Sequence, residues 1–341
     1  MKKTGKIVSL CVVFFILATG QVFSDTPIDD LHSAVNSFSN KIAESLPFNS
    51  TVGLNWSDAY IGQFLGIPPR FGIGVTTGFT TIPISSMNNL LNVFGAGNAM
   101  GNTNMGLPLL SYTLEARIGG FILPFDFGVK FGYLPDLSIP FMNVGMEEYT
   151  LVGADLRYSL LPKIIPIFKA SVGIGINHLR GGISTSFPLG TEFDFSDPTD
   201  THHYKLIMTD PTLTLPWSTT SYELKAQASA SLLIFTPYAG LGIIYAKSNA
   251  GYRIKTEVTI KDENGIEITD LDELDDVRDY LIGLKNFSPN GFERMIENTG
   301  FNVRAYGGVS LNLAVIKFDL TGLYNFTTQS YGLTFGARFQ L

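Results

Sequence analysis

The chain has 341 residues and an acidic balance, with 23 Lys and Arg against 30 Asp and Glu and a formal charge of −7. This charge argues against nucleic-acid binding, and we expect no nucleic-acid partner. The only cysteine is Cys11, which excludes a disulfide within the chain.

The N-terminus has the pattern of a secretory signal peptide. Three lysines precede an apolar run from Ile7 to Ala18. That run is about 12 residues long, shorter than the roughly 20 that a helix needs to cross a bilayer, so we expect cleavage rather than an anchor. Cleavage after Ser24 or after Gly20 fits equally well, and removal of residues 1–24 takes the formal charge from −7 to −10.

The segment 25–69 has a helical period. Leu31, Val35, Phe38, Ile42 and Leu46 recur at intervals of three and four, which predicts an amphipathic helix. We expect Pro47 to end that helix. Residues 51–57 suit a short strand, and Asp58 suits the cap of a second helical turn.

Ten segments beyond residue 69 alternate apolar and polar side chains, the pattern of a strand with one apolar face. Each has roughly the 9 to 12 residues that a tilted strand needs to cross a bilayer. The seventh is the weakest, because Ile243 and Ile244 interrupt the alternation. The segments lie near 71–79, 112–119, 125–133, 149–159, 168–178, 222–232, 238–247, 302–313, 317–326 and 331–341.

The connections between these segments alternate in length. Short ones fall at 122–124, 160–165, 236–237 and 314–316, and long ones at 83–111, 135–147, 179–220 and 248–300. Short periplasmic turns opposite long external loops are typical of outer-membrane barrels, and closure pairs every backbone group inside the bilayer. We therefore predict an all-β fold, an antiparallel transmembrane β-barrel of ten strands over 70–341, with twelve strands as the alternative.

The last strand carries a further signal. Thr334, Gly336, Phe339 and Leu341 occupy a polar, a glycine and two apolar positions at the end of the chain. This pattern resembles the C-terminal insertion signal of bacterial outer-membrane β-barrel proteins, except that it closes on Leu rather than Phe. The resemblance implies a place in the bacterial outer membrane, with lipid and the barrel-assembly machinery as partners.

The apolar stripe of the N-terminal helix needs cover. We expect residues 25–69 to plug the barrel mouth from the periplasmic side, with packing on another periplasmic protein as the alternative. A helical plug with an apolar external mouth is similar in layout to long-chain fatty-acid transporters and porin-like barrels of the outer membrane. The Asn-Pro-Ala motif of that family's plug is absent, and the strand number is smaller.

The inward positions of the predicted strands carry eight cations and five anions, an excess of +3. Either these charges pair and fill the barrel, or they line a passage that favours anions. Many inward positions are glycine, for example Gly72, Gly119 and Gly128, which leaves room for such a passage. The candidate lining residues are Glu115, Arg117, Asp126, Lys130, Asp155, Arg157, Lys169, Glu223, Lys225, Arg304, Lys317, Asp319 and Arg338.

The first long connection has no charged residue, and the whole stretch from Phe71 to Leu114 is uncharged. An adaptable Met-rich apolar surface suits a lipid-like ligand, or a cap packed over the barrel mouth. The candidates for this apolar mouth are Met87, Leu90, Leu91, Phe94, Met100 and Met105.

Other chemistry is weakly indicated. The acidic segment 262–276 has the character of a solvated helix face and lacks the spacing of a calcium loop, so we expect no metal and no cofactor. His178, His202 and His203 show no spacing of a known catalytic site, and we expect no enzyme.

Two functions remain at this point. The first is a narrow pore or transporter for small anionic or apolar solutes. The second is a non-conducting structural or adhesin-like barrel whose acidic external loop binds a partner. The oligomeric state stays open.

Overall fold

The computed structural model describes residues 28–83, 107–139, 144–161, 167–186, 191–196, 203–208, 212–255, 258–261 and 292–341. The expected signal peptide 1–24, the acidic segment 262–276 and His202 lie outside these ranges. So do the apolar mouth candidates Met87, Leu90, Leu91, Phe94, Met100 and Met105. Among the helices that the structure describes, none is long and apolar enough to cross a bilayer.

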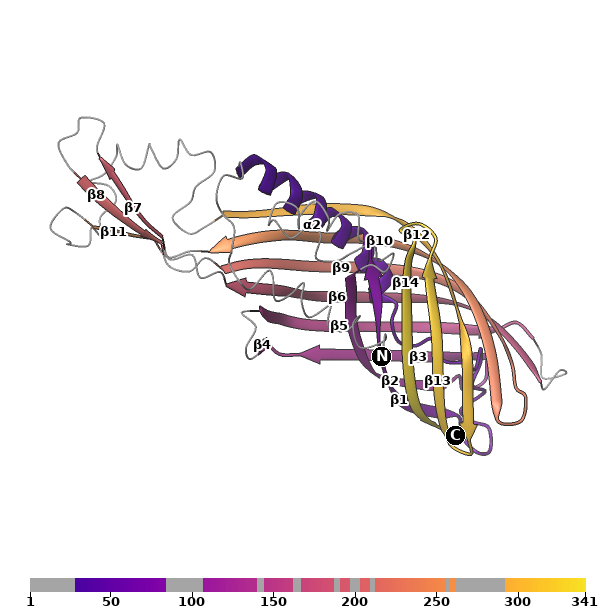
Figure 1. Ribbon diagram of the computed structural model, residues 1–341. Coiled ribbons are helices and arrows are strands. Elements are labelled where there is room, and N and C mark those ends of the chain that lie inside the picture. Colours follow the sequence, from indigo (N-terminus) through magenta and orange to yellow (C-terminus); the bar gives the residue numbers. More distant parts are fainter. Residues whose placement is uncertain are drawn as a thin grey trace, which may run out of the picture.

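Ten antiparallel strands close into a barrel (Figure 1). Their order is β3-β2-β1-β14-β13-β12-β10-β9-β6-β5, and β5 returns to pair with β3. The predicted fold class and the count of ten strands are confirmed. The bounds are β1 Phe71–Ile82, β2 Leu107–Gly119, β3 Phe125–Leu134, β5 Val144–Ser159, β6 Phe168–Ser186, β9 Thr212–Ala230, β10 Phe235–Lys255, β12 Phe292–Leu313, β13 Ile316–Asn325 and β14 Ser330–Gln340.

Four short strands lie outside this ring. β4, Leu137–Ile139, pairs with β5. A separate three-stranded sheet in the order β11-β8-β7 stands beyond the ends of β9 and β10 (Figure 1). Its strands are β7 Thr191–Ser196, β8 His203–Met208 and β11 Val258–Lys261.

The outer face of the barrel is apolar on all ten strands. On β10, outward side chains are apolar or aromatic from Phe235 to Tyr245 and become polar at Lys247. Ten residue steps of about 3.3 Å, at the tilt of about 40° usual in such barrels, give a band roughly 25 Å tall, the height of a bilayer's apolar zone. This is the architecture of an outer-membrane β-barrel. Exposed apolar side chains on the ten strands include Ile73, Leu114, Phe127, Val152, Ile174, Leu224, Leu241, Val303, Leu320 and Phe335.

The two ends of the barrel differ. The connections β2–β3, β5–β6, β9–β10 and β12–β13 are short and share one end, which we call the short-turn end; the opposite end is the long-loop end. At the long-loop end β6, β9, β10 and β12 run past the apolar band, and pairing between β10 and β12 continues to Ile254 and Phe292.

The expected long connections 83–111, 179–220 and 248–300 are therefore too wide. β2 begins at Leu107, β6 continues to Ser186, and β10 continues to Lys255. The physical reason is that the backbone groups of these extensions pair with the neighbouring strand rather than with water.

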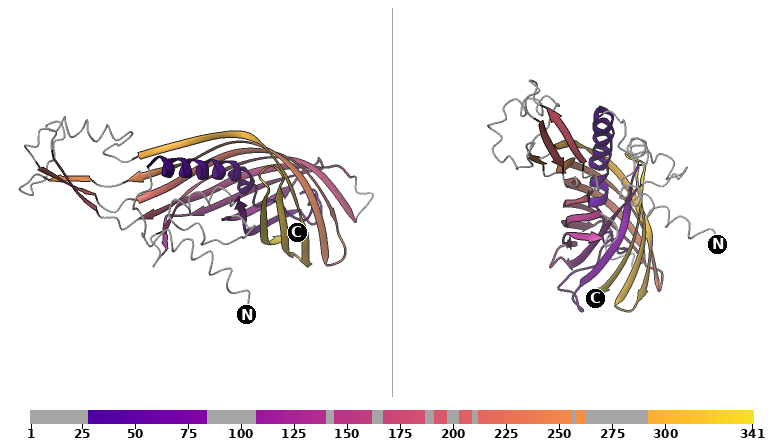
Figure 2. Two further views of the ribbon diagram at one scale, coloured as in Figure 1. Left: turned by 45° about the horizontal axis from the view of Figure 1, so that its top comes forward. Right: turned by 60° about the vertical axis from the view of Figure 1, so that its left-hand side comes forward.

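The N-terminal helix α2, Ile28–Ser50, lies at the long-loop end, not at the short-turn end where a periplasmic plug was expected (Figure 2). It packs against β10, β9 and β12, and the extension of β10 offers buried Ala246, Ala250 and Tyr252 on its inner side. This apolar surface covers the helix stripe, and Phe38 and Ile42 are buried. Pro47 does not end the helix: it sits within its last turn.

Candidate functional site

A stretch of irregular chain runs through the lumen of the barrel. We call residues 51–63 the plug segment; it contains neither the expected strand 51–57 nor a helix capped by Asp58. Just before it, the Asn49 amide donates to Thr80 Oγ1 at 2.9 Å near the long-loop end of β1. Just after it, the Phe64 N–H donates to Gly120 O at 2.8 Å, at the β2–β3 turn. The segment therefore spans the lumen from one end to the other.

The wall satisfies the backbone of the plug segment with polar side chains. Lys130 Nζ donates to Ser50 O at 2.7 Å and to Val52 O at 2.6 Å. A chain without regular structure can be buried because its N–H and C=O groups find partners of this kind. Further bonds of the same type join Leu54 N to Glu115 at 2.9 Å, Gln227 to Trp56 O at 2.7 Å, Arg157 to Asp58 O at 2.8 Å and Ile61 N to Asp126 at 3.0 Å.

Trp56 is the largest side chain that the plug segment places in the lumen. Its indole N–H donates to Glu115 Oε2 at 2.5 Å, and the guanidinium carbons of Arg117 and Arg338 lie 5.6 and 4.9 Å from its ring centroid. Stacked cations of this kind stabilise an aromatic ring in a desolvated site. Trp56 therefore joins β2 to β14 over β1, the strand that lies between them.

Asp58 is the one charged side chain of the plug segment. Lys169 Nζ lies 3.0 Å from Oδ1, while Lys317 Nζ at 2.5 Å, Gln340 Nε2 at 3.1 Å and Arg338 Nη2 at 3.4 Å all reach Oδ2. Burial alone would raise the pKa of the Asp58 carboxyl, but attraction to Lys169, Lys317 and Arg338 holds it well below its usual value. The carboxylate is ionised and joins β6 to β13 and β14.

The candidate lining residues of the wall all face the lumen, and most pair with one another. Arg117 and Arg157 share Asp126, and Arg117 and Lys225 share Asp155, at N–O distances of 2.6 to 2.8 Å. Buried charges require such partners, because an unpaired charge in this environment costs several kcal/mol. The remaining pairs are Arg304 with Glu223 at 2.6 Å and Arg338 with Asp319, while Glu115 accepts from Thr113, Leu54 and Trp56.

The room left by the inward glycines is occupied. A Cβ at Gly72 would lie 2.8 Å from the Trp56 ring, and one at Gly128 would lie 2.7 Å from Arg117 Nη2. At Gly119 the position of a Cβ is taken by Gly62 O. The expectation that these glycines leave an open passage is corrected by this packing. A cavity beside Trp56 and Asp319 has a volume of only about 10 Å³, enough for about one water.

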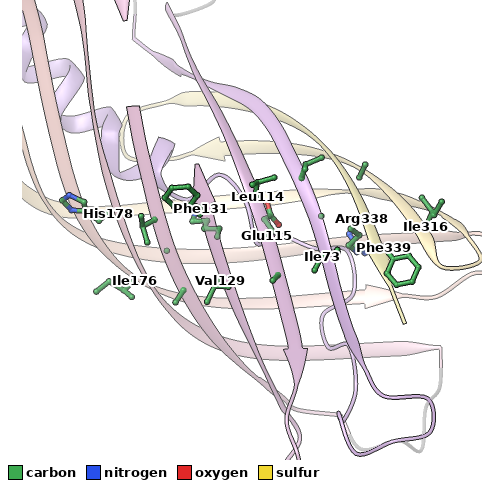
Figure 3. Close-up of a pocket in the computed structure, with 18 residues that line it drawn as sticks. Ile73, Leu114, Glu115, Val129, Phe131, Ile176, His178, Ile316, Arg338 and Phe339 are labelled. Atoms are coloured by element: carbon green, nitrogen blue, oxygen red, sulfur yellow. The ribbon is translucent and has the colours of Figure 1, made fainter. Parts of the chain in front are cut away.

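A larger hollow of about 1140 Å³ lies on the outside of the barrel (Figure 3). Outward side chains such as Ile73, Leu114 and Phe131 line it, and the small Ala116 and Ala154 leave its floor low. It is thus separate from the lumen.

The terminal strand closes the seam of the barrel. Leu341 N donates to Phe71 O at 3.0 Å, and Phe339 pairs with Ile73 on the outer face. Thr334 is buried on the inner face, in register with Gly78 across the seam, and Gly336 is in register with Thr76. The residues of the expected assembly signal therefore sit where β14 meets β1.

His178 lies on the outer face, with Nδ1 2.9 Å from Thr220 Oγ1. Within the described ranges no group of three or more His, Cys, Asp or Glu is arranged to hold a metal ion.

Trp56 and the lumen role of Asp58 were missed by sequence reasoning. A signal for Asp58 existed, because it is the only acidic residue between Glu44 and Glu115 and the predicted lumen had an excess of cations. No such signal existed for Trp56, because the sequence of the plug segment has no periodic pattern.

A family model matches residues 113–340, two thirds of the chain, and its description is a family of unknown function, DUF6588. The chain belongs to the DUF6588 family. The match begins within β2 and ends with β14, so it takes in nine of the ten barrel strands of this DUF6588 protein and leaves out the plug segment. No curated protein matches the sequence.

Solved structures similar to this DUF6588 chain include three from bacteria. The translocator domain of autotransporter NalP from Neisseria meningitidis is 10% identical, with 91% of this chain and 97% of that chain covered and a TM-score of 0.32. The outer-membrane protease OmpT from Escherichia coli is 8% identical, with 80% and 97% covered and a TM-score of 0.35. The Ralstonia pickettii toluene transporter TbuX is 10% identical, with 80% and 89% covered and a TM-score of 0.25. Values this low say nothing about function.

Proposed function

We propose that the protein is an outer-membrane channel for small solutes that its own N-terminal segment closes. The observation that carries the proposal is the identity of the lumen's occupant. Wall side chains alone fill narrow barrels, whereas here a chain segment fills the centre and Gly72 and Gly119 make room for it. Withdrawal of residues 51–63 leaves a passage through the lumen, lined by the polar side chains of the wall.

The chemistry of the plug contacts supports a gate. The contacts between plug segment and wall are mainly hydrogen bonds and ion pairs, for example at Lys130, Glu115 and Asp58. Water and ions can replace such contacts, because a polar group that leaves its partner is solvated in an opened lumen. We propose that the barrel passes solutes and does not catalyse a reaction. The wall has more cations than anions, and this excess favours anions as the solutes.

The orientation follows from secretion. We infer that residues 1–24 are removed as a signal peptide and that the barrel-assembly machinery inserts the chain through its last strand. The short-turn end then faces the periplasm, as is usual for such barrels. α2 lies at the outer surface of the cell in this arrangement, and outer-membrane lipid contacts the apolar band.

A disulfide lock tests the gate. Ser50 Oγ and Ser221 Oγ are 2.8 Å apart, so Ser50→Cys with Ser221→Cys ties the start of the plug segment to β9 with little change in volume. The chain is produced without residues 1–24, which removes Cys11. In planar bilayers we expect brief openings of the wild type, none of the oxidised double variant, and their return with reductant; Ser50→Cys alone is the control.

Deletion of residues 25–69 gives the complementary result. The deleted barrel should conduct steadily and more than the full chain, provided that heat-modifiable gel migration shows it to be folded. A folded deletion variant and a folded Trp56→Ala variant that are both silent would contradict the channel.

A second candidate is contact with a partner at the cell surface. The sheet β11-β8-β7 favours it, because it stands beyond the barrel wall and adds nothing to closure of the barrel. In that case removal of residues 189–209 abolishes partner binding and leaves conductance unchanged.

A further inference from the structure

We infer that the basic side chains around Asp58 form a binding site of the barrel wall for a small organic carboxylate, and that Asp58 occupies this site in the closed state. The inference rests on the proposed channel and names the class of its solute. Its site comprises Lys169 of β6, Lys317 of β13, and Arg338 and Gln340 of β14, which we call the carboxylate site.

The wall supplies cations here without enough anions of its own. In the part of the chain that the structure describes, Lys169 and Lys317 form ion pairs with Asp58. The neighbouring Arg338 has Asp319 as a partner within the wall, and Asp126, Asp155 and Glu223 pair with other wall cations. Glu115 accepts hydrogen bonds from Thr113, Leu54 and Trp56. When the plug segment leaves, both lysines lose their anion, and the wall gains an empty site for one.

The geometry selects a carboxylate over a spherical anion. Donors reach both oxygens of Asp58, with Lys169 on Oδ1 and Lys317 and Gln340 on Oδ2. Charge-assisted hydrogen bonds to two separate oxygens add direction to the attraction between charges. A chloride ion offers one centre and cannot occupy both sets of donors at these distances.

The site is open to solvent at its edge. The side chains of Lys169 and Lys317 are 31% and 14% exposed, whereas that of Asp58 is 3% exposed. The lysines lie on β6 and β13 close to the short turns, because Lys169 is the second residue of β6 and Lys317 the second of β13. A solute at the short-turn end therefore meets these cations first, and local positive potential raises its concentration there.

The competing account is that these cations serve only to hold the plug. In that account, no free carboxylate can take the place of Asp58. The two accounts differ in whether the vacated site binds a small acid.

Replacement of the carboxylate by an external one tests the inference. Purified full-length Asp58→Gly is titrated with sodium acetate and with sodium chloride at equal ionic strength, and the heat of binding and the temperature of unfolding are measured. We expect acetate to bind at least about tenfold more tightly than chloride, because it engages both sets of donors. It should raise the unfolding temperature of the variant and leave that of the wild type unchanged.

Two further variants locate the effect. Asp58→Gly with Lys169→Met and Lys317→Met should lose the acetate response, whereas Asp58→Gly with Lys247→Met should keep it, since Lys247 pairs with Glu297 on the outer face. Equal effects of acetate and chloride on Asp58→Gly, or an acetate response without the two lysines, would overturn the inference.

If the Asp58→Gly variant does not fold, a second measurement tests the carboxylate site. In the otherwise wild-type chain, the buried Ala59→Cys is labelled with a maleimide in acetate or in chloride. Acetate should compete with Asp58, release the plug segment and speed labelling; equal rates contradict the site. Acetate binding by a barrel that never conducts would refute the channel alone, and a conducting barrel indifferent to acetate would refute the site alone.

Discussion

The Trp56 ring packs directly against Gly72 of the wall: a Cβ at residue 72 would lie 2.8 Å from Cζ3 and 2.9 Å from Cη2 of the ring. Gly72 of the wall strand β1 has no side chain, and the space is filled by the Trp56 ring of the plug segment. Because the ring is also fixed by its bond to Glu115, it has little freedom to move away.

Gly72→Ala should therefore loosen the plug. An added methyl group in a packed interior costs about 1 to 3 kcal/mol, and the backbone carbonyl of Phe339 at 3.0 Å limits relief on the other side. We expect more frequent openings in planar bilayers. Gly322→Ala is the control, because the nearest atom to its Cβ is 3.8 Å away. Equal open probabilities in the two variants would refute the role assigned to this pair.

Lys130 should be a main holding point of the plug. It donates to two backbone carbonyls, Ser50 O and Val52 O, and Lys130→Met removes both bonds while keeping the length of the side chain. We expect a loss of ~2 kcal/mol in the free energy of unfolding, measured in urea, since two buried carbonyl oxygens lose their donor.

The matched control for that substitution is Lys247→Met. Lys247 and Glu297 pair at 2.9 Å, but both side chains are more than half exposed, and exposed ion pairs contribute little. A cost as large as that of Lys130→Met would show that the substitution itself, not the plug contact, sets the effect.

Asp58 gives the plug a defined dependence on pH. Since the folded pKa lies well below the usual 3.8, the ionised carboxylate stabilises the closed state fully above pH 3.8. That stabilisation is lost only as the pH falls through the lower folded value. The difference in unfolding free energy between wild type and Asp58→Asn should thus be constant from pH 7 to about pH 5 and shrink below. A difference that already falls between pH 7 and pH 5 would contradict the ion pairs.

The sequence predicted the barrel because its signal is repeated on every strand. Phe127, Val129 and Phe131 alternate with inward residues along β3, and the same period of two recurs on the other strands. Even the doublet that weakened the seventh strand resolves in this way, since Ile243 is exposed on the outer face and Ile244 is buried inside.

The same periodicity could not predict the conformation of the plug segment. Its conformation depends on partners distant in sequence, such as Glu115 for Trp56 and Lys317 for Asp58, and no local period reports them. The extension of β10 to Lys255 was missed for a related reason: beyond Tyr245 its outward residues turn polar, while pairing with β12 continues.

The position of α2 predicts which parts of the chain are reached from outside the cell. If the short-turn end faces the periplasm, α2 lies at the outer surface. Lys41, whose side chain is 39% exposed, can then be labelled there. Ile122, in the β2–β3 turn and 79% exposed, lies on the other side of the membrane. A membrane-impermeant maleimide should react with Lys41→Cys on intact cells and with Ile122→Cys only after the outer membrane is permeabilised.

The labelling result distinguishes an N-terminal chain that passes through the lumen from one that stays in the periplasm. The plug segment connects α2 to β1, whose first residue Phe71 bonds to Leu341 at the short-turn end. Because β1 starts there and α2 lies at the other end, the chain must pass through the lumen, and opposite labelling of the two variants follows. Labelling of both only after permeabilisation would place α2 in the periplasm and exclude a threaded plug. In that case the conductance of the full chain and of the 25–69 deletion should be equal, because the lumen would be free of the segment in both.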